Sequence, residues 1–112
     1  MYWNYDRQSL LIAFCRHLHT DEEIRFFLGG SGYFDVRDKQ ERWIRIKVQK
    51  NDILVLPAGI YHRFAADETR NTRVMRLFSL AQENPVWNPL ARAEPSTDKT
   101  TARVGYVSTF LQ

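Results

Sequence analysis

Three histidines and one glutamate in this chain have the residue types and the spacing of a metal site. His17 and His19 are two residues apart, Glu23 follows four residues later, and His62 comes directly after the segment 57–61. If His17 and His19 lie on a strand, their side chains point to the same face and can reach one point. Imidazole nitrogens with a carboxylate oxygen suit a borderline divalent cation such as iron(II), nickel(II), cobalt(II), manganese(II) or zinc. Four such ligands would leave two positions of an octahedral ion open for a bidentate substrate.

The elements that must position these residues are predicted to be short β-strands. Residues 42–48 alternate between apolar and charged side chains, which is typical of a half-buried strand. The inward-facing set is Ile44, Ile46 and Val48, while Arg45 and Lys47 point outward. The other predicted strands comprise residues 10–19, 23–28, 33–37, 53–56, 61–65 and 72–78. Turns are predicted at residues 29–32, 38–41 and 49–52, where glycine or polar residues cluster.

Strands of this number and length predict an all-β sandwich or barrel, and a jelly-roll barrel would leave few open strand edges. Within it, the apolar strand 53–56 is expected to be buried. The chain is long enough for one domain with one core.

The C-terminal part is expected to differ from the barrel. Residues 84–89 contain two prolines and are predicted to be extended, and residues 93–100 are predicted to be a polar linker. Val104, Val107 and Leu111 then repeat at helical spacing, which predicts a short C-terminal helix.

Composition and charge exclude several function classes. The net charge is +3, but the basic residues are scattered and form no nucleic-acid-binding motif, so we expect no nucleic-acid partner. No apolar run approaches the roughly 20 residues of a membrane-spanning helix, and the first residues lack the features of a signal peptide. The single cysteine, Cys15, allows no internal disulfide and favours the cytoplasm. Cys15 could be an inert buried thiol or a thiol close to the metal.

Each candidate ligand also has a simpler interpretation, because a single histidine in a strand is usually a hydrogen-bonded core residue. The combination is more specific, since it resembles both motifs of the cupin superfamily. The first motif is matched by His17, His19, Glu23 and Gly30, and the second by Pro57, Gly59 and His62. Leu11 stands where a glycine usually opens the first motif, and Asn51 stands where a glycine opens the second. Asparagine tolerates the left-handed backbone conformation, so the second turn can survive this change.

A closer resemblance extends over roughly residues 16–90. The segments 17–25, 30–39, 43–46, 56–64, 75–78 and 85–87 are similar to those of the acireductone dioxygenase family of methionine salvage. This resemblance implies an all-β cupin jelly-roll barrel with a short C-terminal helix, in one cupin domain over residues 1–112. Residues 1–9 match the family poorly, and residues 93–112 would be the polar linker and the helix.

The resemblance also implies a metal-dependent dioxygenase. The family's metal ligands match His17, His19, Glu23 and His62, which would hold one Fe²⁺ or Ni²⁺ per chain. The substrate, the acireductone 1,2-dihydroxy-5-(methylthio)pent-1-en-3-one, would bind as an enediolate through two oxygens and react with O2. Iron would give 4-methylthio-2-oxobutanoate and formate. Nickel would give 3-methylthiopropanoate, formate and carbon monoxide.

Three further residues are candidates for roles in this reaction. Arg25 matches the arginine that the family places beside the metal, where a fixed charge would offset the charge of the substrate anion. Phe64 matches a family aromatic residue near the substrate, and Phe27 shares a predicted strand face with Glu23 and Arg25. Arg25 could instead form a structural salt bridge, and Phe64 could simply pack in the core.

Members of this family usually carry a longer segment before the first histidine, and that segment normally helps to close the site. This difference leaves a second hypothesis, a metal-binding cupin of reduced or no catalytic activity with a regulatory or interaction role. In either case we expect a cytoplasmic protein, also nuclear if eukaryotic. A monomer is favoured, with no nucleic-acid partner and no membrane span.

Overall fold

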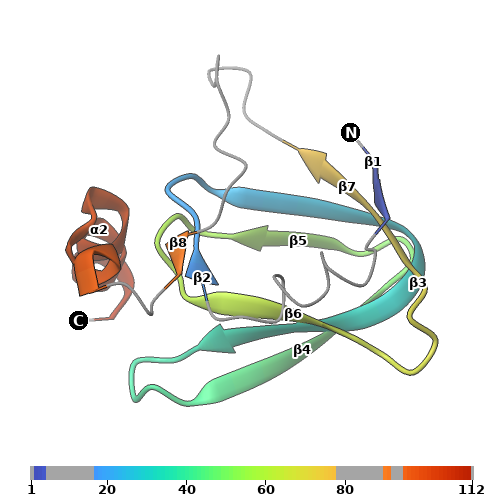
Figure 1. Ribbon diagram of the computed structural model, residues 1–112, viewed down its shortest axis with the longest axis horizontal. Helices are drawn as coiled ribbons and strands as arrows, with labels where there is room; N and C mark the ends of the chain where they lie inside the picture. Colours follow the sequence, from blue (N-terminus) through green and yellow to red (C-terminus); the bar gives the residue numbers. More distant parts are fainter. Residues whose placement is uncertain (1, 5–16, 78–89, 92–94, 112) are drawn as a thin grey trace.

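The protein folds mainly as antiparallel β-strands, and the computed structural model describes residues 2–4, 17–77, 90–91 and 95–111 (Figure 1). The strands are β1 (Tyr2–Asn4), β2 (His17–Leu18), β3 (Glu23–Arg37), β4 (Trp43–Gln49), β5 (Ile53–Leu56), β6 (His62–Ala66), β7 (Thr72–Leu77) and β8 (Leu90–Ala91). A 3-10 helix, η1 (Pro95–Lys99), precedes the C-terminal helix α2 (Thr101–Phe110). The predicted all-β fold with a short C-terminal helix is therefore confirmed. The predictions for residues 10–16, including Cys15, and for residues 84–89 fall outside the described residues.

β3 is the strand around which the other strands are arranged. Residues 23–30 pair with β5 and β7, whereas residues 31–37 pair with β4 and β6. In Figure 1, β3 crosses the upper part of the molecule, turns at the right and returns below. β1 extends one wall by pairing with β7, and β2 extends the other by pairing with β6 and β8. One continuous strand thus contributes to both walls of the barrel.

The turn predicted at residues 29–32 was wrong, because β3 continues through this segment. The pairing with β7 shifts register between Phe27 and Gly29, which marks a β-bulge, and Gly30 has a φ of 73°. A bulge and a glycine with positive φ bend a strand sharply without ending its pairing. The glycine cluster therefore marks the place where β3 passes from one wall to the other.

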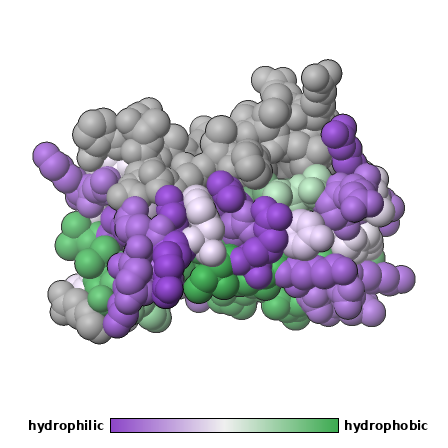
Figure 2. Space-filling model, turned by 90° about the horizontal axis from the view of Figure 1, so that it is seen from below, coloured by the Kyte–Doolittle hydropathy of each residue, from purple (hydrophilic) through white to green (hydrophobic). Residues whose placement is uncertain are grey.

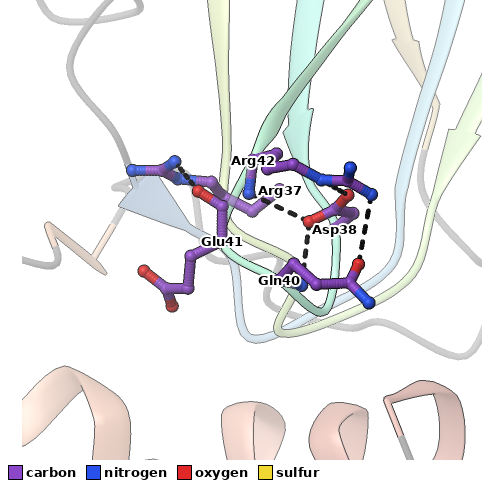
Figure 3. Close-up of polar contacts among 5 residues, drawn as sticks. All are labelled: Arg37, Asp38, Gln40, Glu41 and Arg42. Carbon is purple, nitrogen blue, oxygen red and sulfur yellow. Dashed lines mark hydrogen bonds and ion pairs between the residues drawn. The ribbon is translucent and has the colours of Figure 1, made fainter.

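The turn predicted at residues 38–41 is confirmed, and the side chain of Asp38 stabilises it (Figure 3). The Asp38 carboxylate accepts hydrogen bonds from the backbone amides of Gln40 and Arg42 at 2.9 Å each and from Arg42 Nε at 2.8 Å. Arg37 donates to the carbonyl of Glu41, which has a φ of 64°. This tight connection sets the register of β4 against β3.

The turn predicted at residues 49–52 is also confirmed. Asn51 has a φ of 76°, so it adopts the left-handed conformation that glycine would otherwise supply. Its amide donates to the carbonyl of Phe27 at 2.8 Å, and the Asp52 carboxylate accepts from the amide of Gln49 at 2.9 Å. The departure from the second cupin motif at Asn51 therefore leaves this turn intact.

The core fills the space between the two walls of the barrel. It consists of Phe27, Phe34, Val48, Leu56, Ile60, Phe64, Val74 and Tyr106. The prediction that residues 53–56 are buried was wrong for Ile53 and Val55, whose side chains are 64% and 51% exposed. β5 presents only alternate residues to the core, so its apolar run is divided between two faces.

The inward face predicted for residues 42–48 is correct only in part. Val48 is buried in the core and Ile46 packs against it, but Ile44 is 48% exposed. Ile44 is the second residue of β4, so it lies close to the turn at residues 38–41 that connects β3 and β4. The alternation correctly predicted that Ile44, Ile46 and Val48 share one face of β4. The end of this face that carries Ile44 is not covered by the core.

The predicted C-terminal helix is confirmed, but two of the apolar residues whose spacing predicted it are not buried. Val104 and Val107 are exposed, whereas Arg103 and Tyr106 are the buried residues of α2. The predicted linker at residues 93–100 includes the ordered helix η1, so it is not a plain linker. In the described part of the chain, no helix has the length and apolar character needed to cross a membrane.

An ion-pair network covers the outer face of the strands β4, β3 and β6. Asp35 on β3 lies directly across from Arg45 on one neighbouring strand and Arg63 on the other. Its carboxylate accepts from Arg45 Nε at 2.8 Å, Arg45 Nη2 at 2.9 Å and Arg63 Nε at 2.8 Å. The guanidinium groups of Arg37 and Arg63 each lie 4.2 Å from the ring centroid of Trp43. Hydrophilic residues likewise cover most of the described surface in Figure 2, with hydrophobic residues between and below them.

Replacing Asp35 with asparagine should destabilise the barrel. The Asp35 side chain is 1% exposed, and its hydrogen bond to Arg45, followed by that to Arg63, lowers its pKa against the effect of burial. We expect the free energy of unfolding to fall by about 1–3 kcal/mol near neutral pH. A larger fall is not expected, because Arg45 is half exposed and solvent screens its pair with Asp35. A lowered pKa contributes stability above the unfolded value of about 3.9, and this contribution is lost as the pH falls through the folded pKa. Urea unfolding should therefore show that the unchanged chain and the asparagine variant differ less in free energy of unfolding at acidic pH than at neutral pH.

Candidate metal centre

Three of the four predicted metal ligands come together in the barrel. Glu23 is the first residue of β3, His62 is the first residue of β6, and His19 lies in the connection between β2 and β3. Each residue offers one ligand atom, and the three atoms lie within 4.8 Å of one another. The prediction that a strand continues through His19 was wrong, because β2 ends at Leu18. The convergence therefore depends on three different elements and not on one strand face.

The backbone of His17 lies next to this group. His17 pairs with His62 in the antiparallel register of β2 and β6. Two residues that are directly opposite on antiparallel strands are close neighbours. The side chain of His17 lies outside the described part of the structure, so the complete four-residue ligand set stays a prediction.

The Glu23 carboxylate lies beside both imidazole rings. Its Oε2 is 2.5 Å from His62 Nε2 and 3.8 Å from His19 Nε2, and the two ring centroids are 5.3 Å apart. His62 Nδ1 lies 2.9 Å from the carbonyl oxygen of Ile60. Because a carbonyl oxygen only accepts, His62 donates to it through Nδ1, and Nε2 is the ring nitrogen that faces Glu23.

This arrangement fits a divalent cation. Histidines that bind metals usually donate one N–H to a carbonyl or carboxylate and coordinate through the other nitrogen. His62 has this arrangement, with the Ile60 carbonyl as the acceptor. Imidazole nitrogens together with a carboxylate oxygen suit iron(II), nickel(II) and zinc. The residue types and their mutual orientation therefore match the predicted ligand chemistry.

The charge of Glu23 is stabilised by its neighbours. Burial disfavours the carboxylate, but His62, Arg25 and His19 outweigh this effect and hold the pKa of Glu23 well below its usual value. Arg25 Nη2 pairs with Glu23 Oε1, and Arg25 Nη1 donates to the carbonyl of Ile24 at 3.2 Å. Arg25 therefore forms the salt bridge that the sequence left as an alternative, while Glu23 Oε2 remains directed at the histidines. Its proposed catalytic role stays a prediction.

Comparison with known proteins identifies the family. Residues 4–89 match the sequence profile of the ARD/ARD' family. The chain belongs to the acireductone dioxygenase family. Curated relatives named acireductone dioxygenase from Branchiostoma floridae and Rattus norvegicus are 54% and 52% identical to the chain over 107 and 109 residues. The alignments cover 96% and 97% of this chain but only 56% of each relative, so the chain spans about half their length.

A solved acireductone dioxygenase from Bacillus anthracis shares the fold. The superposition has a TM-score of 0.66 at 25% sequence identity and covers 74% of this chain and 46% of that chain. That structure carries a cadmium ion in its active centre. The cupin barrel predicted from the family resemblance is therefore confirmed.

Arg76, which was not predicted from the sequence, pairs with the residue that holds the candidate ligand Glu23. Arg76 on β7 is directly across from Arg25 on β3, and the two side chains are 7% and 4% exposed. Directly opposite residues on paired strands share a face, so two buried arginines are neighbours on the same face of the sheet. Alternation along residues 72–77 could have placed Arg76 on the same face as Thr72 and Val74, but it could not have shown that Arg76 lies across from Arg25.

The two predicted substrate-binding phenylalanines lie in the core. Phe27 and Phe64 are 0% and 2% exposed. Phe34, which sequence analysis did not single out, connects them to the candidate ligands. Its ring centroid is 5.3 Å from that of Phe64, 6.1 Å from that of Phe27 and 6.3 Å from that of His62. These contacts are those of core packing, and the substrate-binding roles of Phe27 and Phe64 stay predictions.

Proposed function

We propose that the chain is a metal-dependent dioxygenase that cleaves acireductone with O2. One observation carries this proposal: His19, Glu23 and His62 converge in the barrel of a member of the acireductone dioxygenase family. The relatives that match almost all of this chain are named for this activity. The single cysteine supports a reducing compartment, and the cytoplasm is the proposed location.

The proposed ligands are His17, His19, Glu23 and His62, with one Fe²⁺ or Ni²⁺ per chain. The register pairing of His17 with His62 supports the inclusion of His17. When bound, the metal supplies Lewis acidity and a template for two oxygen atoms of the substrate. The Ile60 carbonyl holds His62 in the tautomer that coordinates through Nε2, and Arg25 holds the carboxylate of Glu23.

The substrate is proposed to bind as an anion, and the barrel offers fixed positive charge for it. Arg25 and Arg76 lie side by side in the interior, and guanidinium groups remain charged at all working pH values. A preorganised positive charge in a site that excludes water stabilises an anion more strongly than it would in water. Phe34 and Phe64 supply apolar packing beside His62 and help to exclude water.

The test is oxygen consumption by the chain loaded with Fe²⁺ or with Ni²⁺. Acireductone and one O2 together have the atoms of 4-methylthio-2-oxobutanoate plus formate, or of 3-methylthiopropanoate, formate and carbon monoxide. We expect both loaded forms to consume O2 and release formate, and only the nickel form to release carbon monoxide. The matched control is the metal-free chain in a chelating buffer.

A different result would change the functional assignment. If the chain binds one equivalent of metal but consumes O2 no faster than the metal-free control, the dioxygenase proposal fails. The alternative from the sequence, a metal-binding cupin of reduced or no activity, would then be favoured.

A further inference from the structure

The residue Arg103 on α2 contacts the turn that leads into His62. Its Nη1 donates to the carbonyl of Gly59 at 3.1 Å, and its guanidinium lies 4.4 Å from the ring centroid of Tyr61. Arg103 is 8% exposed, which is unusual for a charged side chain on a short helix near the surface. The charged group of Arg103 therefore contacts the turn and is shielded from solvent.

The same turn contacts both described histidines of the metal centre. The amide of Gly59 donates to the carbonyl of His19 at 3.0 Å, and the carbonyl of Ile60 lies 2.9 Å from His62 Nδ1. Gly59 thus binds Arg103 through its carbonyl and His19 through its amide. The turn is therefore hydrogen bonded to both His19 and His62.

Further contacts make the turn fit closely against η1 and α2. Tyr61 is fully buried and its hydroxyl donates to Asp98 on η1 at 2.5 Å. Gly59 has a φ of 81°, and a Cβ atom there would lie 2.2 Å from the carbonyl oxygen of Ala102. Figure 1 shows α2 at one end of the barrel, beside β8 and β2.

We propose that Arg103 is a positioning residue of the metal centre, acting through the turn at residues 57–61 to hold His62 and His19 in coordinating geometry. The inference rests on the proposed metal centre. Residues that orient ligands through hydrogen bonds commonly change metal affinity without contacting the metal. The C-terminal helix is therefore part of the metal site and not only a cover for the core.

The test compares the Ni²⁺ affinity of the unchanged chain with that of Arg103→Met and Arg103→Lys, measured by competition with a chelator. Arg103→Met should bind Ni²⁺ about 10-fold more weakly, within the range found for residues that orient ligands. Arg103→Lys keeps a donor for the Gly59 carbonyl and should recover part of this loss. The visible absorption bands of bound Co²⁺ should also change in Arg103→Met, because they report ligand geometry.

Two controls separate positioning from helix stability. Thr100 is the N-cap of α2, and its hydroxyl accepts from the Arg103 amide at 3.3 Å. Thr100→Ala should therefore weaken the helix, but it removes no contact between α2 and the turn at residues 57–61. Gly105→Ala should strengthen the helix, since a Cβ atom at Gly105 meets nothing within 4 Å. We expect Thr100→Ala to keep its Ni²⁺ affinity, and Gly105→Ala not to rescue Arg103→Met.

Several outcomes would overturn the inference. An unchanged Ni²⁺ affinity in Arg103→Met would do so, as would an equal loss in Thr100→Ala or a rescue by Gly105→Ala. The last two would show that Arg103 acts only by stabilising the helix. If the unchanged chain binds no Ni²⁺, the proposed metal centre itself is wrong and this inference is overturned with it.

Discussion

The His62→Ala variant should fail to retain metal at concentrations that saturate the unchanged chain. His62 is 2% exposed, its Nε2 is directed at Glu23, and its Nδ1 is held by the Ile60 carbonyl. Removing a ligand should weaken affinity more than removing a residue that only orients ligands, so we expect a loss of more than about 100-fold. Elemental analysis after gel filtration and Ni²⁺ titration would both measure it.

The neighbouring residue on the same strand supplies a matched control. The side chain of Arg63 lies on the outer face of β6, where it pairs with Asp35 and stacks on Trp43. Arg63→Met should lower stability but keep stoichiometric metal. Since a ligand that binds only the folded state raises stability, Ni²⁺ should raise the urea midpoint of Arg63→Met and not that of His62→Ala. Stoichiometric metal in His62→Ala would show that the ligand set is wrong.

The Gly30→Ala variant should be too unstable to fold. Gly30 has a φ of 73°, and a Cβ atom there would lie 1.5 Å from the carbonyl oxygen of Asn71. An alanine there would have to adopt an unfavourable backbone conformation, and its Cβ atom would clash with the backbone just before β7. We expect a loss of more than about 4 kcal/mol, which is exceptional for one substitution. Circular dichroism and urea unfolding would measure it.

Gly29→Ala is the control for this variant. It changes the adjacent glycine in the same strand, but its Cβ atom would meet only Arg73 Cβ at 3.9 Å, which is an ordinary contact. We expect Gly29→Ala to fold and to lose about 1 kcal/mol or less. Equal stability of the two variants would contradict the role assigned to Gly30 in bending β3.

The local features of the fold could be predicted from the sequence because local chemistry sets them. Alternation predicted the strand β4, the polar clusters predicted the turns at residues 38–41 and 49–52, and helical spacing predicted α2. Asn51 adopts the left-handed conformation that its place in the motif required. Motif spacing likewise predicted His19, Glu23 and His62 as ligands, but it did not predict that His19 lies beyond the end of β2.

The features that depend on distant partners could not be predicted. A glycine cluster signals either a turn or a bend in a continuing strand, and only the pairing of β3 with four strands distinguishes the two. Arg76 becomes part of the site through its register against Arg25, which no local pattern encodes. The burial of Arg103 on α2 could not be predicted either, because its partners Gly59 and Tyr61 are far away in the chain.

The continuity of β3 has a consequence for how the barrel opens. Since the same strand is hydrogen bonded in both walls, neither wall can separate from the other without breaking β3 pairing somewhere along residues 23–37. Amide protons in the middle of β3 should therefore exchange with deuterium only through global unfolding, while those of the two-residue strands should exchange through local fluctuations. Because the proposed ligand His17 lies on the two-residue strand β2, a bound ion would leave through local opening of β2 while the pairing of β3 stays intact.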